Sequence, residues 1–141
     1  MGTHSVIKFQ EDGETICAIY QQYDGYPEGV GKELFEFLDN ITIVNGLSVG
    51  QPERVANGVG CLAAQFVAEF KNGAGGFYMT QLDDEQEFNY IVNSCWEGDK
   101  LGEPTITVTR YDDDVLFSGS INLFGVFIDT CGIDDDEDEV A

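Results

Sequence analysis

Residues 5–23 read SVIKFQEDGETICAIYQQY and set the architecture of the chain. Two β-rich segments, Ser5–Phe9 and Thr15–Tyr23, flank the pair Asp12-Gly13. An Asp-Gly turn between such segments is the strongest short signal of a β-hairpin, because glycine accepts the positive φ of the turn without steric cost. Residues 15–20 of the second segment are apolar at nearly every position, so we expect both faces of this strand to be covered inside a sheet.

Two amphipathic segments predict helices. Apolar residues recur at helical spacing over Val30–Ile41 and again over Val59–Phe70. The second segment is apolar nearly all round, so we expect it to pack inside the fold or against another subunit, which favours a homo-oligomer. The expected partner interface comprises Cys61, Ala64, Ala68 and Trp96. Tryptophan is enriched at interface hot spots, although Trp96 fits a core position equally well.

The remaining segments indicate a meander of strands joined by acidic turns. The expected strands are Gly76–Thr80, Glu87–Val92, Thr105–Arg110 and Val115–Ser118. The element order ββααββββ predicts an α+β domain over residues 1–133, with about six strands in a mainly antiparallel sheet covered by two helices. Residues 42–57 give no clear pattern, and residues 121–128 fit either a helix capped by Ser120 or an edge strand.

Acidic residues dominate the charge: 27 Asp and Glu stand against 6 Lys and Arg, for a net charge of −21. This balance argues against direct binding to nucleic acid or to an anionic membrane surface, since both require a basic face. A like-charge block at residues 134–139 repels itself, so we expect residues 134–141 to form a disordered acidic tail. Two readings of the acidity stay open, mimicry of DNA phosphates by an inhibitor and simple solubility.

No basic leader followed by an apolar segment begins the chain, and no apolar segment reaches the length of a membrane span. We therefore expect a cytoplasmic protein. Its four cysteines form no C-x-x-C pair, so we expect reduced and mostly buried thiols rather than disulfides or a metal site. Nothing in the sequence calls for a cofactor.

The segment GYPEGVGK at residues 25–32 superficially resembles a phosphate-binding loop. It has five residues between the relevant glycines instead of four, and Glu33 replaces the Ser or Thr that holds magnesium. We still expect a small-ligand site here, because aromatic side chains and a cation at a helix start can hold a base or an anion. Its candidate residues are Tyr20, Tyr23, Asp24, Tyr26, Gly29, Gly31, Lys32 and Arg110. The alternative is that the tyrosines serve only packing.

Catalysis has little support in the sequence. The single histidine, His4, lies near the chain terminus, which makes a Cys–His or Ser–His pair improbable. The carboxylates are too numerous for any pair to stand out. An enzyme with an unrecognised carboxylate site stays open as a third reading.

Several stretches of the chain carry a family resemblance: residues 23–31, YDGYPEGVG, then Leu34 and Phe37-Leu38, residues 61–66, CLAAQF, and the strand at residues 76–78, GFY. Together they resemble a family of small uncharacterised phage and prophage proteins. The resemblance covers about the first 95 residues and supplies no catalytic residues. It implies a non-enzymatic accessory protein of the host cytoplasm. Such a protein would antagonise host defence, by sequestering a nucleotide-like signal or by blocking a host defence protein.

Overall fold

The hairpin forms as the sequence predicts. In the computed structural model, β1 (Ser5–Glu11) pairs antiparallel with β2 (Glu14–Gln21), and both turn residues have positive φ, 51° at Asp12 and 81° at Gly13. Such values match the turn whose twist suits a hairpin. The structure describes the backbone of residues 3–39, 41–44, 55–111 and 113–140, and the side chains of that set through Cys131.

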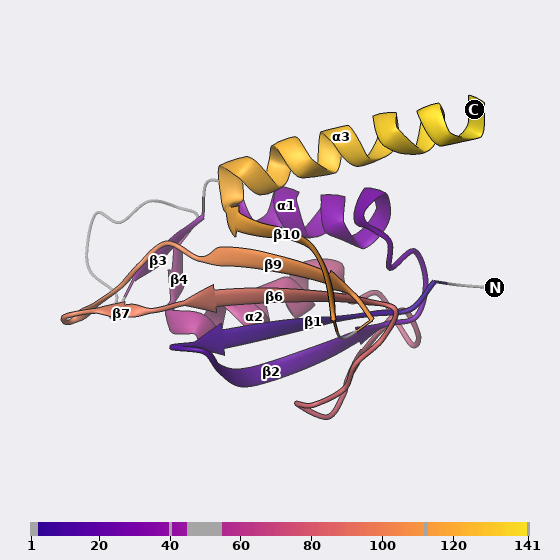
Figure 1. The fold of residues 1–141 in the computed structure, drawn as a ribbon. Coiled ribbons are helices and arrows are strands. Elements are labelled where there is room, and N and C mark those ends of the chain that lie inside the picture. The colour runs from indigo at the N-terminus through magenta and orange to yellow at the C-terminus, as the bar shows by residue number, and fades with distance from the viewer. Residues whose placement is uncertain (1–2, 40, 45–54, 112, 141) are drawn as a thin grey trace.

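β1 and β2 belong to a six-stranded sheet of order β10-β9-β6-β1-β2-β5 (Figure 1). The other strands are β5 (Phe77–Met79), β6 (Phe88–Ser94), β9 (Thr105–Arg110) and β10 (Asp114–Ser120). Every neighbouring pair is antiparallel except β1 and β6, which run parallel. The α+β class with a mainly antiparallel sheet is therefore confirmed.

Three α-helices, rather than the two expected, occur in the described residues. They are α1 (Lys32–Leu38), preceded by the π-helical turn η1 (Pro27–Gly31), α2 (Gly58–Phe70) and α3 (Ile121–Val140). The Ser120 hydroxyl accepts the Leu123 N–H at 3.3 Å, so the capped-helix alternative for residues 121–128 is the correct one. The helical backbone of α3 extends to Val140, over residues for which the sequence predicts a disordered tail.

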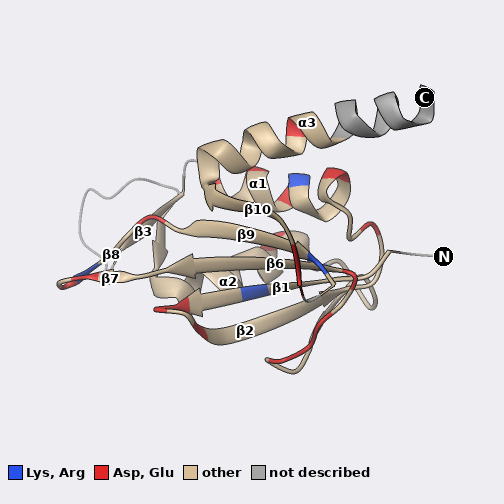
Figure 2. Cartoon of the chain, viewed as in Figure 1, with Lys and Arg blue, Asp and Glu red and all other residues tan. Residues whose placement is uncertain are grey.

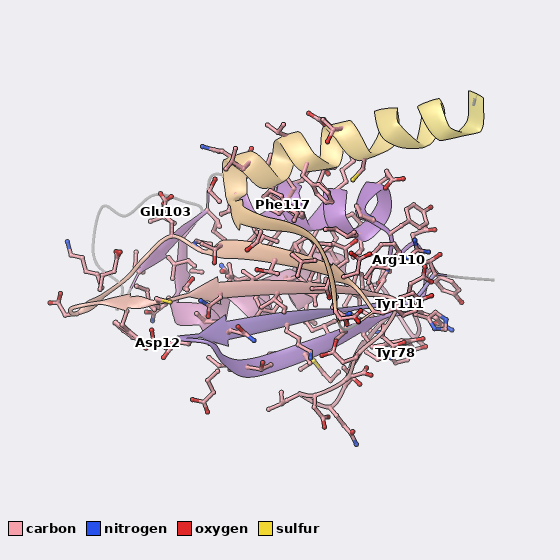
Figure 3. All side chains as sticks on the ribbon, viewed as in Figure 1. Asp12, Tyr78, Glu103, Arg110, Tyr111 and Phe117 are labelled. Atoms are coloured by element: carbon pink, nitrogen blue, oxygen red, sulfur yellow. The ribbon has the colours of Figure 1, made fainter. Side chains whose placement is uncertain are left out.

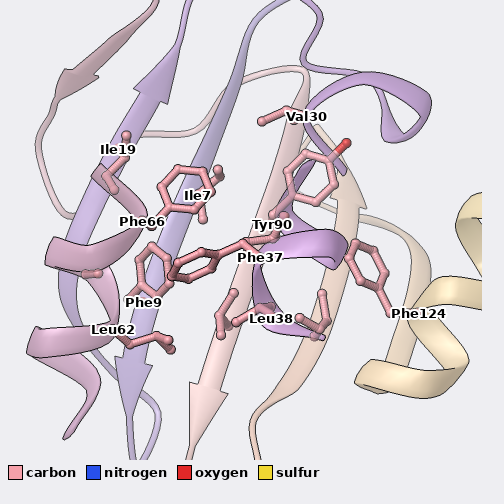
Figure 4. Close-up of a cluster of buried hydrophobic side chains, with 14 of the residues drawn as sticks. Ile7, Phe9, Ile19, Val30, Phe37, Leu38, Leu62, Phe66, Tyr90 and Phe124 are labelled. Atoms are coloured by element: carbon pink, nitrogen blue, oxygen red, sulfur yellow. The ribbon is translucent and has the colours of Figure 1, made fainter. Parts of the chain in front are cut away.

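The helices cover one face of the sheet and enclose an aromatic core (Figure 4). Phe66 of α2 lies at its centre, with ring centroids 5.9 Å from Phe9 of β1, 5.4 Å from Phe37 of α1 and 5.5 Å from Phe77 of β5. α3 closes the core at the β10 edge, where Phe124 is fully buried. This core joins segments from both ends of the chain.

The opposite face of the sheet carries the alternate, mostly polar residues. Lys8 is only 7% exposed there and forms an ion pair with Glu85 at 3.1 Å. Ile16 of β2 is 44% exposed and lies in a β-bulge, because Phe9 is in register with Cys17 and Gln10 with Thr15, which leaves Ile16 without a partner in β1. The expectation that both faces of the second strand are covered therefore fails over its first half.

Two small two-stranded sheets lie outside the main one. β3 (Thr42–Val44) pairs parallel with β4 (Val55–Asn57), and β7 (Trp96–Glu97) pairs antiparallel with β8 (Lys100–Leu101). Residues 45–54, part of the segment without a clear pattern, lie outside the described residues. Within the described part, no helix is both long and apolar enough to cross a membrane.

None of the four cysteines forms a disulfide. Cys17, Cys61 and Cys131 are half-buried and Cys95 is exposed, so the expectation of mostly buried thiols is only partly met. Burial raises the pKa of the Cys17 thiol above its ordinary value, which keeps it protonated near neutral pH.

Candidate functional site

The candidate site begins with a row of three side chains across neighbouring strands. Phe88, the first residue of β6, is in register with Arg110, the last residue of β9. Arg110 is in turn in register with Asp114, the first residue of β10. Figure 3 shows Arg110 and Tyr111 at the end of the sheet opposite the end that carries Asp12. Strand ends thus bring an aromatic ring, a guanidinium and a carboxylate side by side.

The second part of the site is the loop that leads into η1. The Tyr26 hydroxyl donates to Asp24 at 3.1 Å, and this hydrogen bond raises the pKa of Tyr26 above its ordinary value. Pro27 then starts the helical turn, a position where its missing N–H costs nothing. Beneath the loop, the fully buried Tyr90 of β6 donates its hydroxyl to the Gly25 carbonyl at 2.8 Å. The loop is therefore tied to the sheet from below.

Together with α3, the row and the loop line an open cavity of about 550 Å³. Its lining residues are Tyr26, Pro27, Glu28, Phe88, Arg110, Asp114, Leu116, Phe127 and Cys131. Cavities of this size, with mostly apolar walls and a few polar groups that orient the ligand, are typical of small-molecule sites. The cavity therefore has the size and chemistry to hold a compact aromatic molecule.

Arg110 supplies the positive charge among the lining residues. Its guanidinium lies 5.5 Å from the centre of the Phe88 ring and 5.9 Å from that of Tyr111, and it forms an ion pair with Glu87 at 2.9 Å. These contacts hold the planar group against two aromatic faces. Glu28 and Asp114 add two carboxylates to the lining, so the cavity disfavours a ligand with several phosphates.

The glycines of residues 25–31 serve close packing. A Cβ at Gly29 would collide with the Asp24 carbonyl oxygen, and one at Gly31 would lie 2.9 Å from Ile128 and 3.3 Å from Tyr90. Neither Gly29 nor Gly31 lines the cavity. These glycines allow the loop to fold onto itself and let η1 approach β6 and α3.

The structure separates the remaining candidate residues of the predicted ligand site. Tyr20 is in register with Val6 and Tyr78, and so lies on the face of the sheet opposite the helices. The ring centroids of Tyr20 and Tyr78 are 6.1 Å apart. Tyr23 is 52% exposed, and Lys32 is exposed on α1. None of these three lines the cavity, whereas Tyr26 and Arg110 both do.

The predicted interface residues also lie apart. The Trp96 indole N–H donates to Glu11 at 3.0 Å, and its backbone N–H donates to Asp12 at 2.9 Å. Trp96 therefore ties the β7–β8 hairpin to the β1–β2 turn and packs against the core. On α2, Ala64 and Ala68 are exposed and Cys61 is half-buried, so only one side of this helix is covered in the monomer.

Other titratable groups lie away from the cavity lining. Burial, followed by the charges of Asp24 and Glu36, raises the pKa of Glu33 on α1 above its ordinary value. His4 stacks edge-on against Tyr20 with ring centroids 5.5 Å apart. Within the described residues, no three His, Cys, Asp or Glu side chains gather as a metal site would require.

Sequence reasoning missed most of the cavity. Phe88 and Leu116 occur in predicted strands, and Phe127 and Cys131 in the segment after Ser120, with no local pattern that singles them out. The pairing of strand ends is the signal that would have grouped Phe88 with Arg110. That signal depends on the register between distant strands.

No family model, curated protein or solved structure in the comparisons matches the chain. Its function is therefore inferred from the chemistry of the cavity.

Proposed function

We propose that the chain is a non-enzymatic binding protein that holds a small, planar aromatic ligand of low negative charge, such as a nucleotide with one phosphate per base. The observation that carries this proposal is the guanidinium of Arg110, held 5.5 Å from the centre of the Phe88 ring in the lining of an open cavity of about 550 Å³. The guanidinium offers a phosphate a charged donor, and the exposed ring of Tyr26, which also lines the cavity, offers a base a stacking surface.

The acidic lining narrows the ligand class. Glu28 and Asp114 can accept hydrogen bonds from the exocyclic amino groups of a base but would repel additional phosphates. A triphosphate is therefore a poor fit. A nucleoside monophosphate, or a cyclic nucleotide with one charge per phosphate, matches the single guanidinium better.

The resemblance of the first 95 residues to phage proteins suggests the biological role of such binding. In that setting the protein would act in the host cytoplasm and remove a nucleotide-like signal of the host's defence. The exposed small residues Ala64 and Ala68 on α2 support a homo-oligomer, because they would let a second copy approach closely.

The alternative of a DNA mimic requires a broad, continuous carboxylate face. Figure 2 shows that Asp and Glu of the described residues gather mainly in turns at both ends of the sheet, while the strands between them carry few acids. The cavity with its aromatic walls favours ligand binding over mimicry.

Native mass spectrometry of protein purified gently from phage-challenged cells tests the proposal. We expect a stoichiometric adduct of nucleotide mass on the wild type. Arg110→Gln should lower the affinity for the identified nucleotide by roughly tenfold or more, since a charge-assisted hydrogen bond is lost. Lys100→Gln, the same charge change in the β7–β8 hairpin outside the cavity lining, should leave affinity unchanged.

Two results would contradict the proposal. The first is protein without an adduct from those cells, combined with no binding of nucleoside monophosphates or cyclic nucleotides in solution. The second is an adduct whose affinity is equal in Arg110→Gln and in wild type, because the ligand would then lie elsewhere. Thermal unfolding of both variants should accompany the measurements, to show that each is folded.

A further inference from the structure

The edge strand β5 has main-chain groups that point away from the sheet. It pairs with β2 only over residues 19–21. The Thr80 N–H donates to the Ala18 carbonyl, so by the alternation of an antiparallel ladder the Met79 N–H and C=O point away from β2. The Met79 side chain is 67% exposed. This edge can accept a further strand at Met79.

A small apolar pocket opens beside this edge. Its volume is about 290 Å³, and it lies between the C-terminal end of α2 and β5. Its lining residues are Ile19, Val67, Lys71, Phe77, Tyr78 and Met79. The volume falls just below the usual range of small-molecule sites and suits one large side chain of an extended peptide.

Lys71 lies at the rim of the pocket. Its ammonium donates to the carbonyls of Gly75 at 2.9 Å and Phe77 at 2.6 Å, and lies 5.0 Å from the centre of the Tyr78 ring. Among the described residues it forms no ion pair with a carboxylate, although the chain has 27 acidic residues. The site therefore offers a positive charge held by neutral groups beside an apolar pocket, in an otherwise acidic protein.

We propose that β5 and this pocket bind the extended carboxyl-terminal peptide of a partner protein. The peptide adds antiparallel to β5, its last side chain, a large aliphatic or aromatic one, fills the pocket, and its terminal carboxylate contacts the Lys71 ammonium. Lys71 already donates to the outward carbonyl of Phe77, so the carboxyl end of the added peptide lies beside Phe77. The upstream residues of the peptide extend past Met79. In such strand addition, main-chain hydrogen bonds supply affinity and the pocket selects the side chain.

This peptide site is separate from the nucleotide cavity. β5 forms one edge of the sheet, whereas the cavity lies at the ends of β6, β9 and β10 toward the other edge. The two sites share no lining residue. Either can therefore be tested without the other.

Fluorescence anisotropy with short fluorescein-labelled peptides tests the inference. The peptides carry random upstream residues and end in Leu, Phe, Ala or Asp, each as a free carboxylate and as a carboxamide. We expect the free acids ending in Leu or Phe to bind most tightly, and amidation to weaken binding by roughly fivefold. Lys71→Gln should produce a similar loss, while Lys100→Gln should have no effect.

A second variant tests the strand edge itself. Met79→Pro removes an outward-facing N–H together with a side chain that lines the pocket, so it is compared with Met79→Ala, which removes the same side chain and keeps the N–H. Met79→Pro should weaken every peptide more than Met79→Ala does, while thermal stability stays close to wild type, because an edge strand tolerates the loss of an outward N–H. Equal binding of acids and carboxamides would overturn the role of Lys71. No preference for a large last residue would overturn the role of the pocket. Binding of octanoate without binding of any peptide would show that the pocket takes a small amphiphile instead.

Discussion

Tyr90→Phe removes one hydroxyl from the interior and leaves the ring in place. Tyr90 is fully buried, and its hydroxyl donates to the Gly25 carbonyl at 2.8 Å, a contact that joins β6 to a loop 65 residues earlier. The substitution creates no large cavity, so its effect isolates this hydrogen bond. The loop also carries Tyr26, which lines the proposed nucleotide cavity.

The expected loss of stability follows from the carbonyl left behind. Removing the partner of a buried polar group costs about 1–3 kcal/mol, and we expect about 2 kcal/mol here because the phenol ring excludes water from the site. In urea unfolding, the midpoint should fall while the denaturant slope stays unchanged, since the area exposed on unfolding is the same. Tyr23→Phe is the matched control, because Tyr23 is 52% exposed and its change should stay within about 0.5 kcal/mol.

One result would refute this reasoning. If Tyr90→Phe unfolds within about 0.5 kcal/mol of wild type, the Gly25 carbonyl finds another donor and the hydroxyl does not hold the loop. A lower slope would instead indicate a more compact unfolded state, and the free energies could not be compared directly.

Two further predictions concern pH and glycine packing. Burial, followed by the charges of Cys131 and Glu28, raises the pKa of Tyr90 well above the ordinary value of 10.0, so the folded state stays neutral where the unfolded state ionises. Stability should therefore fall as pH rises above about 10, and a plot of unfolding free energy against pH should fall less steeply for Tyr90→Phe. Gly29→Ala should destabilise the protein by about 1–3 kcal/mol, because the added methyl meets the Asp24 carbonyl. Gly60→Ala should instead stabilise the protein by about 0.5–1 kcal/mol, because Gly60 lies on α2 with open space around the added methyl. Thermal melts measure both variants, and a shift of the melting temperature in the same direction for both would contradict the packing argument.

Local patterns in the sequence predicted the elements well. The Asp12-Gly13 turn, the alternation of threonines with Ile106 and Val108 in β9, and the helical spacing in α2 all depend on neighbouring residues, and all three elements form as expected. In β9, Ile106 and Val108 are fully buried. The α+β class follows from the order of these elements.

The candidate site was predicted only in part. Tyr26 and Arg110 were both expected at a ligand site, and both line the cavity. Tyr20 was expected beside Tyr26, but the period of two in a strand places it on the other face of the sheet. Sequence proximity alone could not reveal this, because the face that a strand buries depends on which neighbours it pairs with.

The sequence by itself therefore determined the hairpin, the helix spacing and the acidic balance, since each follows from residue types a few positions apart. Only the tertiary structure decided the parallel pairing of β1 with β6 and the meeting of Phe88, Arg110 and Asp114 at one end of the sheet. The physical reason is that strand register and the packing of α3 depend on contacts between segments far apart in the chain. Burial of the shared core, and not any local preference, selects among those contacts.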